Sequence, residues 1–179
     1  MATTYTPPAR LFHWLTVGLL VASFGIALSM TRMDAGDEKL RVYSWHEWVG
    51  ITIFVVTIAR LLWRLTHPAP PFDLPWIERV SAGATYVAMY IVLMVQPIVG
   101  LMMSAAFGFQ VVYLGLLPLP RIVAENKELA ATLQQVHFAL ALVLVALFLL
   151  HMGGVLYHHL MLQDGVLRRM LPGARAGTK

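Results

Sequence analysis

Four histidines stand inside long apolar stretches of the chain, where an ionisable side chain is costly and is usually kept for function. His137 and His151 share one stretch and are fourteen residues apart, whereas His13 and His46 each lie near the start of another stretch. Fourteen residues are close to four helical turns, so the two imidazoles of the shared stretch would face the same way, about 21 Å apart along the helix. This spacing predicts two metal or haem centres stacked across a bilayer.

The apolar stretches that carry these histidines have the length of membrane helices. Of the 179 residues, 59% are hydrophobic and only 12% are charged, about half the charged share of a typical soluble domain. About 20 apolar residues cross a bilayer core. We expect one all-α domain over residues 1–179, with four membrane helices at residues 11–30, 45–65, 80–106 and 129–160.

The connections between the expected spans differ in character. Residues 31–44 are polar, and residues 66–79 contain four prolines and should be extended. Within the third connection, the apolar piece 111–117 is too short to cross a bilayer, so it should lie at the interface or cover the bundle. Pro97, inside the third span, is tolerated in a membrane helix and usually kinks it.

The chain contains no cysteine. This excludes disulfides, thiolate-ligated zinc, iron–sulfur clusters and haem attached through a Cys-x-x-Cys-His motif. A zinc or copper site is an alternative in principle, but a pair of histidines supplies only two nitrogens. The carboxylate nearest to one of the histidines, Glu47, is expected to face the outer aqueous side.

Lysine and arginine are distributed unevenly between the two sides of the expected bundle. If both termini lie on one side, that side holds eight of the 13 Lys and Arg residues and the other side holds five. The positive-inside rule therefore favours an orientation with both termini in the cytoplasm. The net charge of +4 follows from this basicity at the membrane surface. Nucleic acid is not an expected partner, because no basic patch is interleaved with aromatics outside the membrane.

Helix direction decides which histidines share a depth. The first span leaves the cytoplasm, whereas the second and fourth return to it. His13 and His151 should therefore lie toward the cytoplasmic side, and His46 and His137 toward the outer side. Each pair could supply two axial nitrogens to one iron. Two imidazoles on a six-coordinate haem leave no open position, which suits electron transfer better than oxygen binding.

Small residues near the histidines have two interpretations. They would let a flat macrocycle approach the helix backbone, or they would serve ordinary helix packing, in which small residues are also enriched. These residues are Gly18, Gly50, Gly153 and Gly154.

Three further polar side chains near the cytoplasmic side also have an ordinary and a functional interpretation. Arg60 and Arg64 are one turn apart, and they either extend to the membrane surface or pair with haem propionates. His158 follows His151 by seven residues and so returns to the same face. It is either an interfacial residue or a contact for a propionate or a quinone head group.

Short motifs follow one another along nearly the whole chain. They are Arg10-Leu-Phe-His13-Trp14, His46 with Gly50, Ala59-Arg60-Leu-Leu-Trp-Arg64-Leu, Pro68-Ala-Pro70-Pro71, Gln96-Pro97-Ile-Val-Gly100, His137, His151, His158-His159 and Asp164-Gly-Val-Leu-Arg-Arg169-Met170. In this combination the chain resembles the bacterial cytochrome b561 family of small di-haem membrane proteins. The resemblance implies two b-type haems enclosed by the four helices, one ligated by His13 and His151 and the other by His46 and His137.

The resemblance also implies electron exchange with the quinone pool. Some members of the family look like superoxide oxidases, which take an electron from superoxide at the periplasmic face and pass it through the haems to ubiquinone. Net charge does not support electrostatic steering of the superoxide anion, because the outer side carries six acidic against five basic residues.

Three functions of different classes are compatible with these observations. The favoured one is an enzyme, a superoxide:quinone oxidoreductase. The second is a b-type haem anchor subunit that passes electrons between a partner dehydrogenase or hydrogenase and quinone, although the chain has no extended arm for docking such a partner. The third is a four-helix membrane protein without redox activity, which predicts a colourless preparation.

Overall fold

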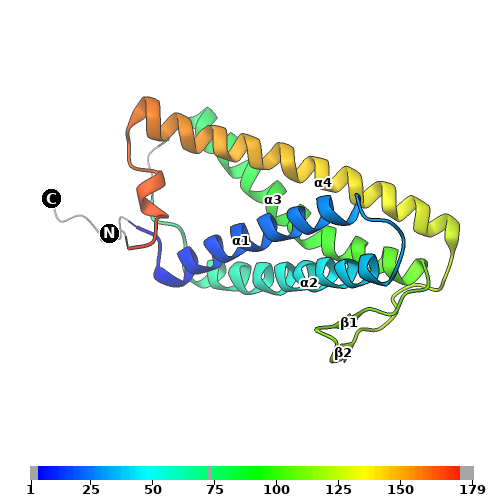
Figure 1. The fold of residues 1–179 in the computed structure, drawn as a ribbon. Coiled ribbons are helices and arrows are strands. Elements are labelled where there is room, and N and C mark those ends of the chain that lie inside the picture. The colour runs from blue at the N-terminus through cyan, green and yellow to red at the C-terminus, as the bar shows by residue number, and fades with distance from the viewer. Residues whose placement is uncertain (1–3, 72–73, 174–179) are drawn as a thin grey trace.

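Four long helices form the body of the molecule (Figure 1). The computed structural model describes residues 4–71 and 74–173. The helices are α1 (Pro7–Met30), α2 (Asp37–Thr66), α3 (Trp76–Ala106) and α4 (Lys127–Leu156). Each is long and apolar enough to cross a membrane, α4 together with the turn that continues it to Leu162. The predicted all-α bundle of four membrane helices is therefore confirmed.

The local sequence explains where the first two helices begin. Pro7 opens α1, where a proline costs nothing because the first N–H groups of a helix have no partner in the helix. Helix α2 begins at Asp37 and not near residue 45 as expected, so the second half of the polar connection 31–44 is helical. Asp37 and Glu38 stabilise this start, because negative charge is favourable at a helix N-terminus.

The starts of the other two helices follow similar rules. Helix α3 begins at Trp76, directly after Pro75, so the expected non-helical connection 66–79 is several residues too long. Helix α4 begins after Asn126, whose side-chain oxygen accepts a 2.9 Å hydrogen bond from the N–H of Leu129. Pro97 lies inside α3, and the helix continues past it to Ala106.

Helices that are neighbours in the sequence pack against each other, α1 on α2, α2 on α3 and α3 on α4. The main buried cluster joins α2, α3 and α4 through Ile53, Val92 and Leu144. Ala106 and Ala130 are fully buried in a second cluster, where their small side chains let α3 and α4 approach closely. Among the four described helices, α1 and α4 are not a closely packed pair, and the rings of His13 and His151 face each other between them.

A short hairpin follows α3 at the end of the bundle away from the termini (Figure 1). Its strands β1 (Val112–Tyr113) and β2 (Leu117–Pro118) pair antiparallel. The hairpin is fastened to α2, because Trp48 Nε1 donates to the carbonyl of Val112 at 2.8 Å and the hydroxyls of Tyr113 and Thr52 lie 2.9 Å apart. The apolar piece 111–117 therefore does not cross the bundle and lies beside the part of α2 that is away from the termini.

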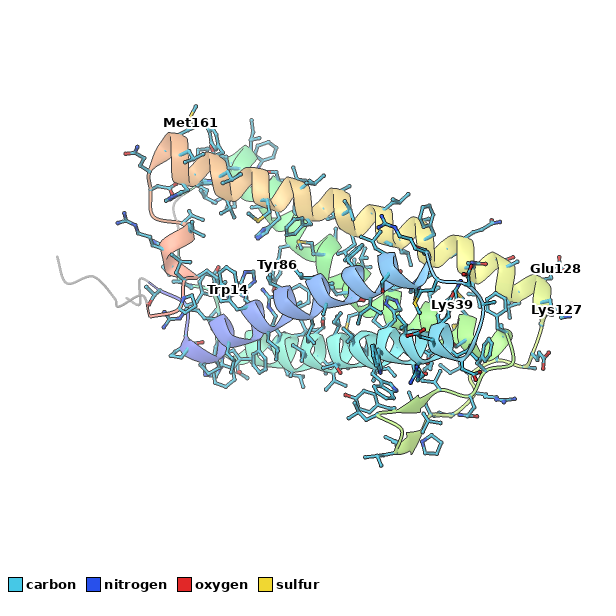
Figure 2. The ribbon with its side chains drawn as sticks, in the orientation of Figure 1. Trp14, Lys39, Tyr86, Lys127, Glu128 and Met161 are labelled. Atoms are coloured by element: carbon cyan, nitrogen blue, oxygen red, sulfur yellow. The ribbon has the colours of Figure 1, made fainter. Side chains whose placement is uncertain are left out.

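The C-terminal segment folds back over the start of α1. A π-helical turn (Tyr157–Leu162) continues α4, and a short 3-10 turn (Leu167–Arg169) follows it. Trp14 Nε1 donates to the carbonyl of Met170 at 2.9 Å, which ties this segment to α1. Figure 2 shows Trp14 and Met161 toward this end of the bundle, with Lys39, Lys127 and Glu128 at the opposite end. We call the end that holds Trp14 and Met161 the terminal end, because the described part of the chain begins and ends there.

Candidate functional site

Two pairs of histidine rings face each other across the bundle. The ring centroids of His13 on α1 and His151 on α4 lie 6.3 Å apart, with an interplanar angle of 63°. Those of His46 on α2 and His137 on α4 lie 6.2 Å apart, with an angle of 79°. All four side chains are half-buried. The structure thus brings together the same partners that the depth argument pairs.

These ring separations fit a metal ion held between two imidazoles. A metal–imidazole bond is about 2.0–2.1 Å long and the ring centre lies roughly 1.1 Å beyond the nitrogen, so two imidazoles on one ion have centroids about 6.3 Å apart. Among the described residues, no third His, Asp or Glu joins either pair to form a metal-binding group. Two protein nitrogens are too few for zinc but suffice for the iron of a haem, whose macrocycle supplies four further nitrogens.

The surroundings of His46 leave one ring nitrogen available for a metal. Its Nδ1 lies 3.3 Å from the carbonyl oxygen of Ser23 on α1, to which an Nδ1–H donates. In that tautomer Nε2 carries the lone pair. Metal-binding histidines commonly have such a bond to a backbone carbonyl, which fixes both the tautomer and the ring orientation.

His137 is positioned by helix α3. Gln96 Nε2 donates a 2.9 Å hydrogen bond to the main-chain carbonyl of His137. Gly100 lies so close that a Cβ at its position would be 3.1 Å from Cε1 of the imidazole. The Nδ1 atom of His137 is buried and has no hydrogen-bond partner within the described part of the chain.

His13 is contacted by a cation. Arg60 Nη2 donates to Nδ1 of His13 at 3.3 Å, and the guanidinium also lies over the ring of Tyr90, 5.5 Å from its centroid. A neutral imidazole that accepts at Nδ1 carries its hydrogen on Nε2. Binding of a metal through Nε2 therefore requires Arg60 to release Nδ1, which would leave the guanidinium available for an anionic group nearby.

Arg64 extends the same cationic region of the terminal end. Its guanidinium lies 5.8 Å from the ring centroid of Tyr5 and 5.9 Å from that of Tyr86. Both Arg60 and Arg64 are half-buried among aromatic rings. They are therefore partly withdrawn from the lipid face, and their planar guanidinium groups suit carboxylate recognition.

His158 is held in a cluster with two carboxylates. Its Nδ1 lies 2.5 Å from Oδ2 of Asp164, and its Nε2 lies 3.7 Å from Oε2 of Glu78 on α3. Helix α4 places His158 about 10 Å along the axis from His151, toward the terminal end. The structure therefore separates this cluster from the two ring pairs.

This arrangement has known relatives. The model of the prokaryotic cytochrome b561 family matches residues 4–173 of the chain. The chain belongs to the prokaryotic cytochrome b561 family. Members of this family are membrane electron-transfer proteins that bind b-type haem.

Three similar proteins show how this cytochrome b561 relates to others. Over 180 residues it is 30% identical to cytochrome b561 homolog 2 of Escherichia coli (strain K12), and the alignment covers 96% of this chain and 95% of the relative. Over 166 residues it is 28% identical to the probable superoxide oxidase CybB of Yersinia pestis, and the alignment covers 91% of this chain and 93% of the relative. Over 165 residues it is 27% identical to cytochrome b561 homolog 1 of Escherichia coli (strain K12), and the alignment covers 89% of this chain and 92% of the relative.

The glycines near the histidines of this cytochrome b561 fall into two groups. A Cβ added at Gly18, Gly50, Gly153 or Gly154 would meet no protein atom within 4 Å. Of these only Gly50 is half-buried, so it is the best placed to face a macrocycle inside the bundle. Gly100, which carried no such expectation, is the glycine in tight contact with a histidine.

The expectation that Glu47 of this cytochrome b561 faces the outer aqueous side is wrong. Glu47 points from α2 toward α3, where the hydroxyl of the buried Ser104 donates a hydrogen bond to its carboxylate. A polar partner offsets part of the cost of withdrawing the carboxylate from water. No sequence signal could reveal this pairing, because Ser104 is 57 residues further along the chain.

Other residues around the histidines were also missed from the sequence. Ser23 on α1 contacts the ring of His46 through its main-chain carbonyl. Gln96 on α3 contacts the main-chain carbonyl of His137 through its side-chain amide. Gln96 stands in a family-like motif, but the motif did not indicate what the side chain contacts. Glu78 carried no signal at all, since a carboxylate near a helix start is ordinary.

Proposed function

We propose that this cytochrome b561 carries electrons across the bacterial inner membrane through two b-type haems, from superoxide at the periplasmic face to ubiquinone. One haem would be held by His13 and His151, and the other by His46 and His137. The observation that carries this proposal is the pair of ring separations, 6.3 and 6.2 Å, in a bundle that offers no third protein ligand among its described residues.

The b-type haems supply one-electron redox chemistry when bound. The chain's own residues hold and tune them. The hydrogen bond from His46 to the Ser23 carbonyl orients one imidazole, and Gln96 and Gly100 position another. Two histidines would hold each haem, an arrangement that would favour electron transfer over oxygen binding.

The cations of the terminal end are proposed to bind the haem carboxylates there. Arg60 contacts His13, and both Arg60 and Arg64 lie over tyrosine rings, which lowers their mobility without neutralising their charge. A guanidinium paired with a carboxylate in a partly buried place forms strong, charge-assisted hydrogen bonds. The functional interpretation of Arg60 and Arg64 is therefore preferred over simple extension to the membrane surface.

The direction of electron flow rests on orientation and on a relative. Eight of the 13 Lys and Arg residues fall on the side that holds the termini, which supports placing the terminal end in the cytoplasm. The name of one relative, probable superoxide oxidase CybB, supports superoxide as the electron donor. Ubiquinone as acceptor follows from the family resemblance of the motifs.

A spectroscopic experiment tests the proposal. Purified protein in detergent should contain two haems per chain, and superoxide from xanthine and xanthine oxidase should reduce them faster than in the presence of superoxide dismutase. Addition of a short-chain ubiquinone should then reoxidise them. One haem per chain, or equal reduction with and without the dismutase, would contradict the proposal.

One observation favours the anchor-subunit alternative. The hairpin tip on the outer side is apolar and exposed, with Leu116 84% and Leu114 53% accessible. Such a tip suits the membrane interface or a partner protein that delivers electrons. Stoichiometric co-purification of a dehydrogenase or hydrogenase subunit, lost when Leu116 is changed to Ser, would favour the anchor over the enzyme.

A further inference from the structure

Two buried polar atoms that make no hydrogen bond come from facing residues of α3 and α4. One is Oε1 of Gln96 on α3, and the other is Nδ1 of His137 on α4, and neither has a partner among the described residues. A buried polar atom that makes no hydrogen bond is costly, and in a native protein it calls for an explanation. Oε1 is an acceptor, whereas Nδ1 is a ring nitrogen that can carry a hydrogen and donate it.

Both atoms belong to one contact between the two helices. Gly100 follows Gln96 by four residues, so the two positions share a face of α3. A Cβ at Gly100 would lie 3.1 Å from Cε1 and 3.5 Å from Nδ1 of His137, so the ring edge that holds Nδ1 faces this part of α3. The side chain of Gln96 already contacts the same residue, because its Nε2 donates to the main-chain carbonyl of His137 at 2.9 Å.

The main-chain carbonyl of His137 fixes the orientation of the Gln96 amide. A carbonyl oxygen only accepts hydrogen bonds, so the NH₂ group of the amide faces it, and the reversed amide would place two oxygens against each other. The bond from Nε2 therefore holds Oε1 beside His137 as well, with its lone pairs unused.

Ligation of a metal by His137 determines where its ring hydrogen lies. A neutral imidazole has a single N–H, so a ring that binds a metal through Nε2 carries its hydrogen on Nδ1. Metal-binding histidines almost always donate this N–H to a carboxylate, a carbonyl or a water. His46, on the other side of the pair, has such a partner in the carbonyl of Ser23, 3.3 Å from its Nδ1. His137 has the donor, and Gln96 presents an unused acceptor to it.

We propose that Gln96 is a positioning residue for the haem between His46 and His137, and that its Oε1 accepts the Nδ1–H of His137. This inference rests on the haem ligation in the proposed function. The amide then holds His137 twice, at the main-chain carbonyl and at the ring. A hydrogen bond from Nδ1–H makes the imidazole a more electron-rich ligand. It favours Fe(III) over Fe(II) and lowers the reduction potential of this haem.

The other pair of histidines has the opposite environment. Arg60 Nη2 contacts Nδ1 of His13 at 3.3 Å, and a nearby cation favours the reduced iron. Gln96 therefore lowers the potential at one centre while Arg60 raises it at the other. Both effects favour the movement of an electron from the haem of His46 and His137 toward that of His13 and His151.

The competing explanation is a purely structural tie. In that case Gln96 would act only through the bond from Nε2 to the main chain of His137, which joins α3 to α4. Loss of such a tie lowers stability and haem content. It does not make the haem potential depend on whether residue 96 offers an acceptor to the ring.

A redox titration of the haem-loaded protein tests the bond to the ring. Gln96→Met keeps the length of the side chain but removes the acceptor. It should raise the potential of the haem that His46→Ala removes by about 59 mV, a tenfold change in a one-electron equilibrium, as expected for about one hydrogen bond. Gln96→Glu retains an acceptor, so its potential should stay at or below that of the wild type. Gln134→Met changes an exposed glutamine one turn before His137 and should match the wild type.

An infrared measurement detects the bond in the wild type itself. The protein is prepared with glutamine that carries ¹³C at the side-chain carbonyl, and the spectra of its reduced and oxidised forms are subtracted. An amide oxygen that accepts from a haem ligand should give a label-sensitive carbonyl band in this difference. The band should be absent in Gln96→Met and retained in Gln134→Met.

The two measurements separate failure of this inference from failure of the proposed function. Potentials that do not shift, or that shift equally in Gln96→Met and Gln96→Glu, would overturn the role of Gln96. If Gln96→Met loses the haem, the wild-type infrared difference decides, because the lack of a label-sensitive band also overturns it. If His46→Ala and His137→Ala retain the full haem content of the wild type, the proposed ligation fails and this inference fails with it.

Discussion

Gly100 on α3 lies against the imidazole of His137 on α4, so that a methyl group in its place would be 3.1 Å from the ring carbon Cε1. Most contacts of a real Cβ are longer than this, and the ring must move or tilt if the space is filled. Helix α3 therefore acts as a support that sets the position of His137 relative to His46, 6.2 Å away between centroids.

Gly100→Ala should disturb the centre formed by His46 and His137. Overpacking of this kind costs about 1–3 kcal/mol, which exceeds the gain of about 1 kcal/mol from replacing a helical glycine by alanine. We expect a lower melting temperature and altered absorption of one haem only. Gly83→Ala, on the same helix with no atom within 4 Å of the new Cβ, is the matched control and should be neutral or stabilising. Equal behaviour of the two variants would contradict the support role.

Removal of a single histidine should affect one haem at a time. His46→Ala should lose mainly the haem proposed between His46 and His137, and His13→Ala mainly the one proposed between His13 and His151, because the rings pair with different residues of α4. Haem-to-protein ratios and reduced-minus-oxidised spectra measure this. His67→Ala removes an exposed histidine that stacks on Trp63 and should retain both haems. Loss of both haems, or of neither, in each ligand variant would argue against the pairing.

Arg60→Gln should lower the reduction potential of the haem that we propose between His13 and His151. A nearby cation favours the reduced iron, which carries less positive charge, and its removal should change the energy by about 1–2 kcal/mol, roughly 40–90 mV for one electron. A spectroelectrochemical titration measures both potentials. Arg41→Gln, which removes an exposed arginine at the other end of α2, is the control and should leave this potential unchanged. A shift of the other haem alone would contradict the placement of Arg60.

Acid should weaken the tie between Asp164 and His158. The pKa of Asp164 lies below its ordinary value because the hydrogen bonds from His158 and Val166 outweigh the opposing effect of burial. A carboxyl with a depressed pKa in the folded state stabilises the fold above its unfolded pKa, and this contribution is lost as the pH falls through the folded pKa. The side chain is only half-buried and the charge is partly screened by solvent, so the effect should be at most about 1 kcal/mol.

Melting temperatures of the wild type and Asp164→Asn test this dependence. The two proteins should differ at neutral pH, and the difference should disappear under strongly acidic conditions, where the wild-type carboxyl is protonated. Asp34→Asn is a suitable control, because Asp34 is an exposed aspartate of the connection between α1 and α2. A difference that persists in acid would mean that the carboxylate charge does not stabilise the fold.

Much of the fold could be predicted because lipid imposes simple rules on sequence. Hydrocarbon demands helices of about 20 apolar residues, so the four spans can be recognised in the sequence alone. Their ends were less predictable. Helix α2 extends back to Asp37 because helix-terminal charge and not hydropathy decides where it starts, and the π-helical continuation of α4 has no signature in composition.

The sequence by itself determined the class of protein, the number of spans and the pairs of histidines that share a depth, because spacing along a helix converts directly into height in a bilayer. Only the tertiary structure decided which side chains meet across helices. Ser23 beside His46, Gly100 against His137, Ser104 on Glu47 and Glu78 near His158 each join residues distant in the chain. Such contacts depend on the rotation of each helix about its axis. Packing against the neighbouring helices determines this rotation, and the hydropathy of the sequence does not predict it.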